Sequence, residues 1–294
     1  MPLIDKVRIG ISGWNYSGWR GRFYPPGLPH RRELSYAAGK FRTIEVNGTF
    51  YSLKRPENFA QWAAATPDDF VFSLKGSRYI THILWLRNVT KALANFFASG
   101  LLRLGPKLGP ILWQLPPNFP FDPQRLETFF KLLPRDTESA AAFARRHDKR
   151  VSGRAWTKTD SKRRIRHAIE IRHTSFVASE FIELLRAHDV ALVCADTVEW
   201  PCLMDVTSDF VYCRLHGSEE LYASGYDKEA LDTWAARVTA WARGKEAPDG
   251  DRVAPPARKN RASRDVFIYF DNDAKVRAPV DAKGLIARVT RLLK

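Results

Sequence analysis

The sequence predicts a single (β/α)8 barrel, in which eight parallel strands form a closed cylinder surrounded by the helices that connect them. Short apolar, β-branched segments alternate with segments of helical periodicity along the chain, as parallel strands with crossover helices require. There are eight strand segments, more than an open doubly wound sheet typically contains. The 294 residues, 45% of them hydrophobic, suffice for one large core, so we expect one domain over residues 1–294.

The elements follow one another in the order that this fold requires. The predicted strands are residues 7–12, 42–46, 70–75, 109–115, 167–171, 190–195, 210–215 and 265–270. The predicted helices are residues 32–40, 57–65, 88–103, 123–132, 178–188, 228–242 and 281–293. Between the sixth and seventh strands there is room only for a short, tight connection. Prolines stand where these segments start and stop, at Pro56, Pro67, Pro123 and Pro201.

The turn after the first predicted strand argues against a nucleotide-binding sheet. Residues 12–16 read SGWNY, not G-x-G-x-x-G, and they open a long aromatic loop in place of a helix. No G-x-x-x-x-G-K-[ST] segment occurs either. Within the loop, we expect Trp19 and Phe23 to anchor the chain against the barrel, and Trp14 and Tyr16 to face a pocket.

The formal net charge of +15 raises the question of a polyanionic partner. Residues 134–166 contain eleven Lys and Arg against four Asp and Glu, and residues 243–264 contain seven against three. These two segments hold eleven of the fifteen excess charges, so the rest of the chain is close to balanced. We interpret 134–166, with a helix at 137–147, as a basic insertion before the fifth strand. The Pro-rich segment 244–264 is predicted to be an exposed, mobile insertion before the eighth.

The beginning of the chain lacks the basic start and long apolar stretch of a secretory signal. No apolar run approaches the roughly 18 residues that suggest a membrane span. Cys194, Cys202 and Cys213 are odd in number and show no C-x-x-C spacing, which favours buried thiols over a disulfide or a zinc site. We therefore expect a cytoplasmic protein with reduced cysteines and no membrane association. The sequence does not indicate the oligomeric state.

Every predicted strand ends in a polar or ionisable residue. In (β/α)8 barrels the C-terminal strand ends and the loops after them form the active face, so we expect one pocket there. The candidates for charge-bearing and acid–base roles are Glu45, Lys75, Glu170, Arg172, His173, Asp196, Arg214 and His216. The candidates for ligand contacts are Trp14, Tyr16, Asn47, Tyr51, His82, Gln114, Tyr222 and Asn272.

The residue types at these ends suit an anionic ligand. Three cations, Lys75, Arg172 and Arg214, would hold a carboxylate or phosphate if they converge in one mouth. Glu45 and Asp196 offer carboxylates for proton transfer or for balancing those cations. The alternative is that the charged residues only terminate strands at solvent.

Period-two spacing pairs some of these residues on one face of a strand. Glu170 and Arg172 are two apart, as are Arg214 and His216. The first pair is equally compatible with a purely structural ion pair. His173 is expected at the rim, where an imidazole can act as an acid or base.

No cofactor is expected. The residues that can ligate a metal are Glu45, His82, Glu170, His173, Asp196 and His216. They lack any H-E-x-x-H or other close spacing, and the three nearby cations disfavour a divalent ion. A Ser-His-Asp triad is not supported, because Ser12 lacks a G-x-S-x-G turn.

Seven segments resemble the YecE-like family, known as domain of unknown function 72. They are GISGWNYSGWRGRFYPPGLP, EVNGTFYSL, FSLKGSRYITH, LWQLPPNFPFDP, AIEIRHTSF, DFVYCRLHGSEELYASGY and IYFDNDAKVRAP, in the family's order from about Val7 to the last helix. The resemblance implies a TIM barrel with one shared pocket and no established reaction. The positions similar to the family's recurrent polar residues are Trp14, Glu45, Asn47, Lys75, His82, Gln114, Glu170, Arg172, His173, Asp196, Arg214, His216 and Asn272. The two insertions indicate a longer subgroup.

Three functions remain open. The first is a hydrolase or lyase acting on a small anionic, phosphate- or sugar-containing substrate at the barrel mouth. The second is a nucleic-acid-associated protein that uses the basic insertions on phosphates. The third is a ligand-binding barrel without turnover. Salt-dependent nucleic-acid binding identifies the second, and pocket variants that lose binding in a protein without turnover identify the third.

Overall fold

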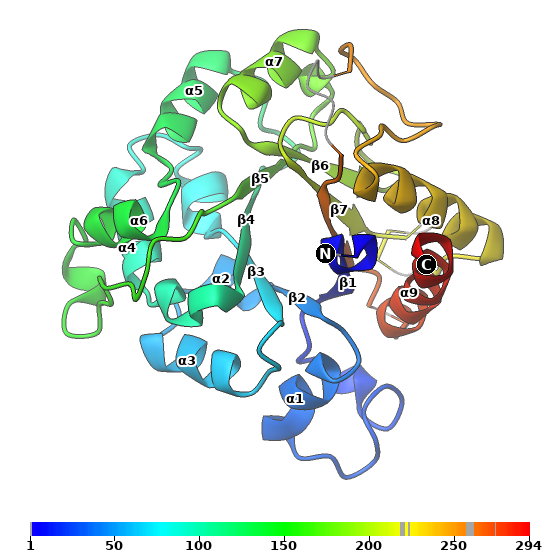
Figure 1. Cartoon of the computed structure of the whole chain (residues 1–294). Helices are drawn as coiled ribbons and strands as arrows, with labels where there is room; N and C mark the ends of the chain where they lie inside the picture. The colour runs from blue at the N-terminus through cyan, green and yellow to red at the C-terminus, as the bar shows by residue number, and fades with distance from the viewer. Residues whose placement is uncertain (1, 218–220, 223, 257–261, 274) are drawn as a thin grey trace.

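The computed structural model describes residues 2–217, 221–222, 224–256, 262–273 and 275–294. Within these residues, parallel strands close into a barrel in sequence order, with β8 paired to β1 (Figure 1). The strands are β1 (Val7–Ser12), β2 (Thr43–Val46), β3 (Val71–Lys75), β4 (Leu108–Gln114), β5 (His167–Glu170), β6 (Ala191–Asp196), β7 (Phe210–Leu215) and β8 (Asp265–Phe270). The predicted (β/α)8 barrel is therefore confirmed, with strand limits that differ from the prediction by at most one residue.

Helices surround the barrel (Figure 1). They are α1 (Glu33–Ala38), α2 (Gly48–Tyr51), α3 (Pro56–Ala64), α4 (Thr90–Ala98), α5 (Pro123–Leu132), α6 (Thr137–Ala144), α7 (Ser179–Ala187), α8 (Lys228–Ala242) and α9 (Ala278–Leu293). The helix predicted at 88–103 is shorter, because Gly100 adopts a left-handed conformation (φ 113°) that ends it. Residues 197–209 connect β6 to β7 without a helix, as expected. Among the described residues, no helix is both long and apolar enough to span a membrane.

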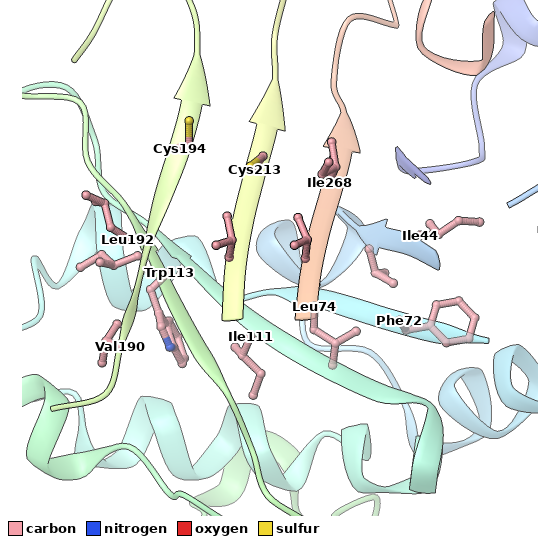
Figure 2. Close-up of a cluster of buried hydrophobic side chains, with 14 of the residues drawn as sticks. Ile44, Phe72, Leu74, Ile111, Trp113, Val190, Leu192, Cys194, Cys213 and Ile268 are labelled. Carbon is pink, nitrogen blue, oxygen red and sulfur yellow. The ribbon is translucent and has the colours of Figure 1, made fainter. Parts of the chain in front are cut away.

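Alternation along the strands separates two buried layers. Side chains on the outer faces pack with the helices, and Ile44, Leu74, Ile111 and Ile268 belong to this layer (Figure 2). Side chains on the inner faces form a second cluster that fills the barrel. It includes Leu112, Ala168, Val193, Ala195, Phe210, Tyr212, Phe267 and Tyr269.

Two tyrosines form a floor beneath the C-terminal mouth. The hydroxyl of Tyr212 lies 2.8 Å from the hydroxyl of Ser73, and the hydroxyl of Tyr269 lies 2.8 Å from that of Thr43. Gly10 makes room for this layer, because a Cβ there would lie 2.0 Å from the Thr43 carbonyl oxygen. Side chains thus fill the middle of the barrel. Inward-facing polar residues nearer the C-terminal ends of the strands can therefore meet only at the mouth.

The insertion at 134–166 packs along α4 instead of projecting into solvent. Asn95 accepts a hydrogen bond from the backbone N–H of Asp148, and the N–H of Trp156 donates to the carbonyl of Ala98. Its helix, α6, ends at Ala144, earlier than the predicted residue 147. The insertion is therefore an ordered part of the barrel's outer layer.

The segment 244–264, which we expected to be surface-exposed and mobile, is exposed over only part of its described length. Ala247, Ala254 and Arg264 are buried, and Asp205 accepts hydrogen bonds from the N–H groups of Val253 and Ala254. Small apolar residues between the prolines allow this close packing, which the overall polarity of the segment did not indicate. Residues 257–261 of this insertion lie outside the described residues.

Candidate functional site

Arg214 lies at the centre of the barrel mouth with a completely buried side chain. Its Nε donates to Oε2 of Glu45 at 3.1 Å, Nη1 donates to Oε2 of Glu170 at 2.7 Å, and Nη2 donates to Oδ2 of Asp271 at 2.7 Å. These carboxylates come from β2, from β5 and from just after β8. One guanidinium on β7 thus joins three other strands, as its five donors in a planar fork allow.

The charges of this cluster shift the pKa values of its carboxyl groups. Burial alone would raise the pKa values of Glu170 and Asp271, but the neighbouring positive and hydrogen-bonding groups, Arg214 foremost, together outweigh it and hold both below their usual range. In turn, Asp271, Glu45 and Glu170 overcome the effect of burial on Arg214 and raise its pKa. Both carboxylates and the guanidinium are therefore charged at neutral pH.

Arg172 forms a second cationic position at the mouth. Its Nε and Nη2 donate to Oε1 of Glu170 at 3.0 and 2.9 Å, so the same-face placement of these two residues is confirmed. The guanidinium stacks on the Trp200 ring, 4.0 Å from its centroid, and donates to the hydroxyl of Tyr222 at 3.3 Å. Arg172 is consequently fixed between a carboxylate and two aromatic rings.

His216 lies below this aromatic cover and is fully buried. Its ring contacts those of Trp200 and Tyr222 edge to face. Its Nε2 lies 3.5 Å from Nη1 of Arg214, and its Nδ1 lies 3.2 Å from Oδ2 of Asp271. Because a guanidinium can only donate, Nε2 is the acceptor in its contact with Arg214, and Nδ1 faces Asp271.

Glu45 is held from a further side by two hydroxyl groups. Ser12 and Tyr212 both donate to its carboxylate. Asn47 donates to Ser12 at 3.1 Å, and Tyr16 donates to the Ser12 carbonyl at 2.6 Å. The hydroxyl of Ser12 is thus part of a carboxylate-binding network.

Lys75 differs from the two arginines. Only 7% of its surface is exposed, yet it has neither an ion pair nor a hydrogen bond from its side chain among the described residues. Its ammonium lies over the Phe50 ring, 4.5 Å from the centroid. Burial and the charge of Arg214 lower its pKa to about 8. Lys75 is therefore a shielded cation for which the described residues supply no carboxylate partner.

Helix α2, which the sequence analysis missed, positions Phe50 beside Lys75. The hydroxyl of Thr49 donates to the Lys75 carbonyl at 2.7 Å and ties α2 to the end of β3. His82 packs edge to face on the same Phe50 ring, and burial, together with Arg172 and Lys75, lowers its pKa to about 4. Tyr51, 68% exposed, lies at the rim beside Phe50.

Two predicted ligand contacts differ in their hydrogen bonding. Gln114 pairs in register with Glu170, is 5% exposed, and its side-chain amide has no hydrogen-bond partner among the described residues. Tyr222 instead bonds Arg172 and covers His216. Within the described residues, the mouth therefore contains an unpaired ammonium, that of Lys75, and an unpaired amide, that of Gln114.

Four predicted site residues have their observed contacts elsewhere. Asp196 accepts from Nε1 of Trp234 on α8 at 3.1 Å, and Asn272 donates to Asp281 on α9 at 2.8 Å. The reason is alternation: Ala195 faces the interior on β6, so Asp196 faces outward, and Asp271 takes the inward position that we assigned to Asn272. His173 caps a short 3-10 helix by accepting from the Ser175 N–H. Trp14 contacts Trp62 on α3 edge to face.

Sequence reasoning also missed Asp271, Asp273 and Trp200. Phe267, Tyr269 and Asp271 share one face of β8 by period two, and this pattern was a usable signal for Asp271. Asp273 lies two residues after Asp271, and burial together with the charge of Asp271 raises the pKa of Asp273 to about 6. Trp200 lies in the β6–β7 connection, where no periodicity indicates which side chain covers the mouth.

Metal binding and anion binding are both constrained by these contacts. The described residues contain no cluster of three or more His, Cys, Asp or Glu side chains suited to a metal ion. Arg214 and Arg172 are each bonded to carboxylates of the protein, so within the described part of the chain Lys75 alone of the three predicted cations keeps its charge unpaired.

Comparison with known proteins places the chain among proteins without an assigned reaction. The sequence model of a family described as "Protein of unknown function DUF72" matches residues 8–293. The UPF0759 protein YecE of Escherichia coli K12 is 30% identical over 127 residues, and YunF of Bacillus subtilis is 26% identical over 118 residues. The matched segments span less than half of each relative, 43% of YecE and 41% of YunF.

Solved structures agree in fold. A DUF72 family protein of Thermotoga maritima has a TM-score of 0.71 and 24% identity, with 98% of both chains covered. One of Enterococcus faecalis has a TM-score of 0.66 and 15% identity, with 97% of this chain and 95% of that chain covered. Because the same share of both chains is covered, this chain and the Thermotoga chain are of similar length. The comparison therefore does not show the greater length that we expected for this chain.

Proposed function

The chain belongs to the DUF72 family, and from the geometry of its barrel mouth we propose that it is an enzyme, a hydrolase or lyase, acting on a small anionic substrate there. One observation supports this most: Lys75, buried at the end of β3, has no carboxylate partner among the residues that the structure describes. An ammonium removed from water is costly unless an opposite charge compensates it. A bound anion would supply that charge.

The neighbouring groups support the same interpretation. The free amide of Gln114 offers two donors to an anion. Asp271, with His216 beside it, offers a carboxylate for proton transfer, and His82 contacts the same Phe50 ring as Lys75. Arg214 and Arg172 hold Glu45, Glu170 and Asp271 in place, which keeps the site preorganised for catalysis.

The test compares two buried lysines. Inorganic phosphate and small carboxylates such as malonate are titrated calorimetrically against the wild type, Lys75→Gln and Lys107→Gln. Lys107 is a matched control, because it is 8% exposed but bonds the carbonyls of Ala63 and Thr66. We expect Lys75→Gln to weaken anion binding at least tenfold and Lys107→Gln to leave it unchanged. Equal binding by all three proteins would refute the proposed site.

Turnover separates an enzyme from a ligand-binding barrel. A panel of phosphate esters and carboxylic acids is incubated with wild type and Lys75→Gln, and products are followed by mass spectrometry. Loss of a substrate with wild type alone supports the enzyme. Anion binding that depends on Lys75, without any product across the panel, supports a barrel that binds without turnover.

A second candidate function, nucleic-acid binding, follows from where the basic insertion lies. Arg150 of the insertion stacks on Tyr79 in the loop after β3, 4.9 Å from the ring centroid. A groove of about 170 Å³ lies there, lined among others by Tyr51, Asn95 and Arg150. The insertion thus brings positive charge to the groove that the exposed ring of Tyr51 also lines, and positive charge beside an exposed aromatic ring is the combination that single-stranded nucleic acid requires.

Salt dependence tests this second candidate. Single-stranded oligonucleotide binding is measured by fluorescence anisotropy at several salt concentrations. If the rim binds phosphates, Arg150→Ala should weaken binding and reduce the salt slope by about one per lost contact. Lys75→Gln should leave both nearly unchanged. A wild type that shows no salt-dependent binding would refute this candidate.

A further inference from the structure

We propose that the ε-amine of Lys75 forms a covalent imine with the carbonyl carbon of an anionic aldehyde or ketone. This inference rests on the proposed function and deepens it, because it names the substrate class and the bond by which the mouth engages it. The inference starts from the placement of Lys75 at the C-terminal end of β3. Its amine is shielded from water and lies over the Phe50 ring.

Comparison with Lys107 shows why Lys75 suits this role. Both lysines are nearly buried, at 7% and 8% exposure. The ammonium of Lys107 donates to the Ala63 carbonyl at 2.6 Å and to the Thr66 carbonyl and hydroxyl at 2.7 and 3.4 Å, which uses all three protons. Lys75 makes no such bond to any residue that the structure describes. It can therefore lose a proton without breaking a hydrogen bond, and its nitrogen lone pair is then free to react.

The charged groups around Lys75 favour the neutral amine. Arg214 repels the ammonium, whereas the carboxylates that attract it, Glu45, Asp271 and Glu170, are already bonded to arginines. With the pKa of Lys75 lowered to about 8, roughly a quarter of the amine is neutral at pH 7.5, against about one part in a thousand for an exposed lysine. Desolvation next to another cation is an established way to activate a lysine as a nucleophile.

The reaction balances without an outside oxidant or reductant. The nitrogen lone pair attacks the carbonyl carbon, forming the C–N bond and moving the C=O π pair to oxygen, and the nitrogen then passes one of its protons to that oxygen. The resulting carbinolamine takes a second proton from solvent on the same oxygen, which leaves as water when the C–O bond breaks, and the nitrogen lone pair forms the C=N bond of a protonated imine. His82 contacts the same Phe50 ring as Lys75, and burial lowers its pKa to about 4, so at pH 7.5 it adds no second positive charge near the amine.

The imine would act as an electron sink for the substrate. Protonated, it keeps the positive charge of Lys75 in the mouth, so attraction for the substrate's anionic group persists. When a bond to the carbon next to the imine breaks, its electron pair can move toward the positively charged C=N group, which stabilises it. This step is lyase chemistry, and the inference thus favours a lyase over a hydrolase.

Reductive trapping tests the inference. The protein is incubated at pH 7.5 with pyruvate or glyceraldehyde 3-phosphate and sodium cyanoborohydride, and adducts are located by peptide mass spectrometry. We expect at least one compound to label Lys75 ten times more than Lys107, which serves as an internal control. Lys75→Arg, which keeps the charge, and Lys75→Met, which keeps the length, should both lose the label while retaining the wild-type circular dichroism spectrum.

Carbonyl-free analogues separate the two proposals. Lactate and glycerol 3-phosphate carry the same anionic groups but cannot form an imine. If they bind the wild type and Lys75→Arg, but no carbonyl compound labels Lys75 above Lys107, the imine is refuted and the anion site stands. If neither analogue binds and no label forms, both proposals fail. A label that persists in Lys75→Arg would also overturn the inference, because another amine would then be responsible.

Discussion

Replacing Arg214 by leucine removes the centre of the buried charge cluster and tests whether Arg214 holds the mouth together. The guanidinium bonds Glu45, Glu170 and Asp271, and both its side chain and those of the two glutamates are 0% exposed. Breaking one buried pair destabilises a protein by about 3–5 kcal/mol, because the remaining charge is uncompensated. Since Arg172 still bonds Glu170, we expect a loss in this range for Arg214→Leu, not a multiple of it.

The expected loss also depends on pH. The pKa values of Glu170 and Asp271 lie below their unfolded values, so in the wild type their contribution is present above the unfolded pKa and lost as the pH falls through the folded one. Without Arg214 their pKa values should rise, because burial then dominates. Protonation at mildly acidic pH should relieve the buried charge, and the difference between variant and wild type should shrink from pH 7 to pH 5.

Urea unfolding followed by circular dichroism at pH 7 and pH 5 measures both effects. The control is Arg163→Leu, which removes an exposed bidentate pair with Asp160 and should change the unfolding free energy by less than about 1 kcal/mol. A loss below about 1 kcal/mol for Arg214→Leu at pH 7, or one that grows toward pH 5, would refute the reasoning.

Two further predictions concern residues that support the site. Gly76→Ala should destabilise the protein by about 1–3 kcal/mol, because the added Cβ would lie 2.3 Å from the buried Trp113 ring. Gly18→Ala, with nothing within 4 Å, is its control, and equal urea midpoints would contradict the prediction. Burial lowers the pKa of His167 to about 3, so its contribution should be lost as the pH falls below about 6.5, by about 2 kcal/mol at pH 5. His167→Gln should flatten the decline in unfolding free energy between pH 7 and pH 5, and an unchanged slope would contradict this.

The fold could be predicted because two periodicities dominate the sequence. Alternating strands and amphipathic helices follow one another, and a strand of fixed period has only two registers, one of which buries polar residues. The same rule explains the errors at Asp196 and Asn272. The residue types at the end of a strand do not show which side chain faces the barrel interior and which faces outward.

The pairing of charges could not be predicted. Arg214 is 169 residues from Glu45 and 44 from Glu170, so which carboxylates reach it depends on the closure of the barrel. The residue types at the strand ends suggested that Lys75, Arg172 and Arg214 would all bind an external anion. In the structure, both arginines instead pair with carboxylates of the protein. Helix α2 could not be predicted either, because it is only four residues long and a single turn shows no helical periodicity in the sequence.

The unpaired state of Lys75 is the central claim, and its titration tests that claim most directly. Trace acetylation with acetic anhydride, measured at a series of pH values by peptide mass spectrometry, reports the neutral fraction of each lysine. We predict a half-maximal rate for Lys75 near pH 8, while exposed lysines follow their ordinary pKa of about 10.4. A midpoint for Lys75 at or above that of the exposed lysines would show that a protein carboxylate pairs with it and would contradict the account.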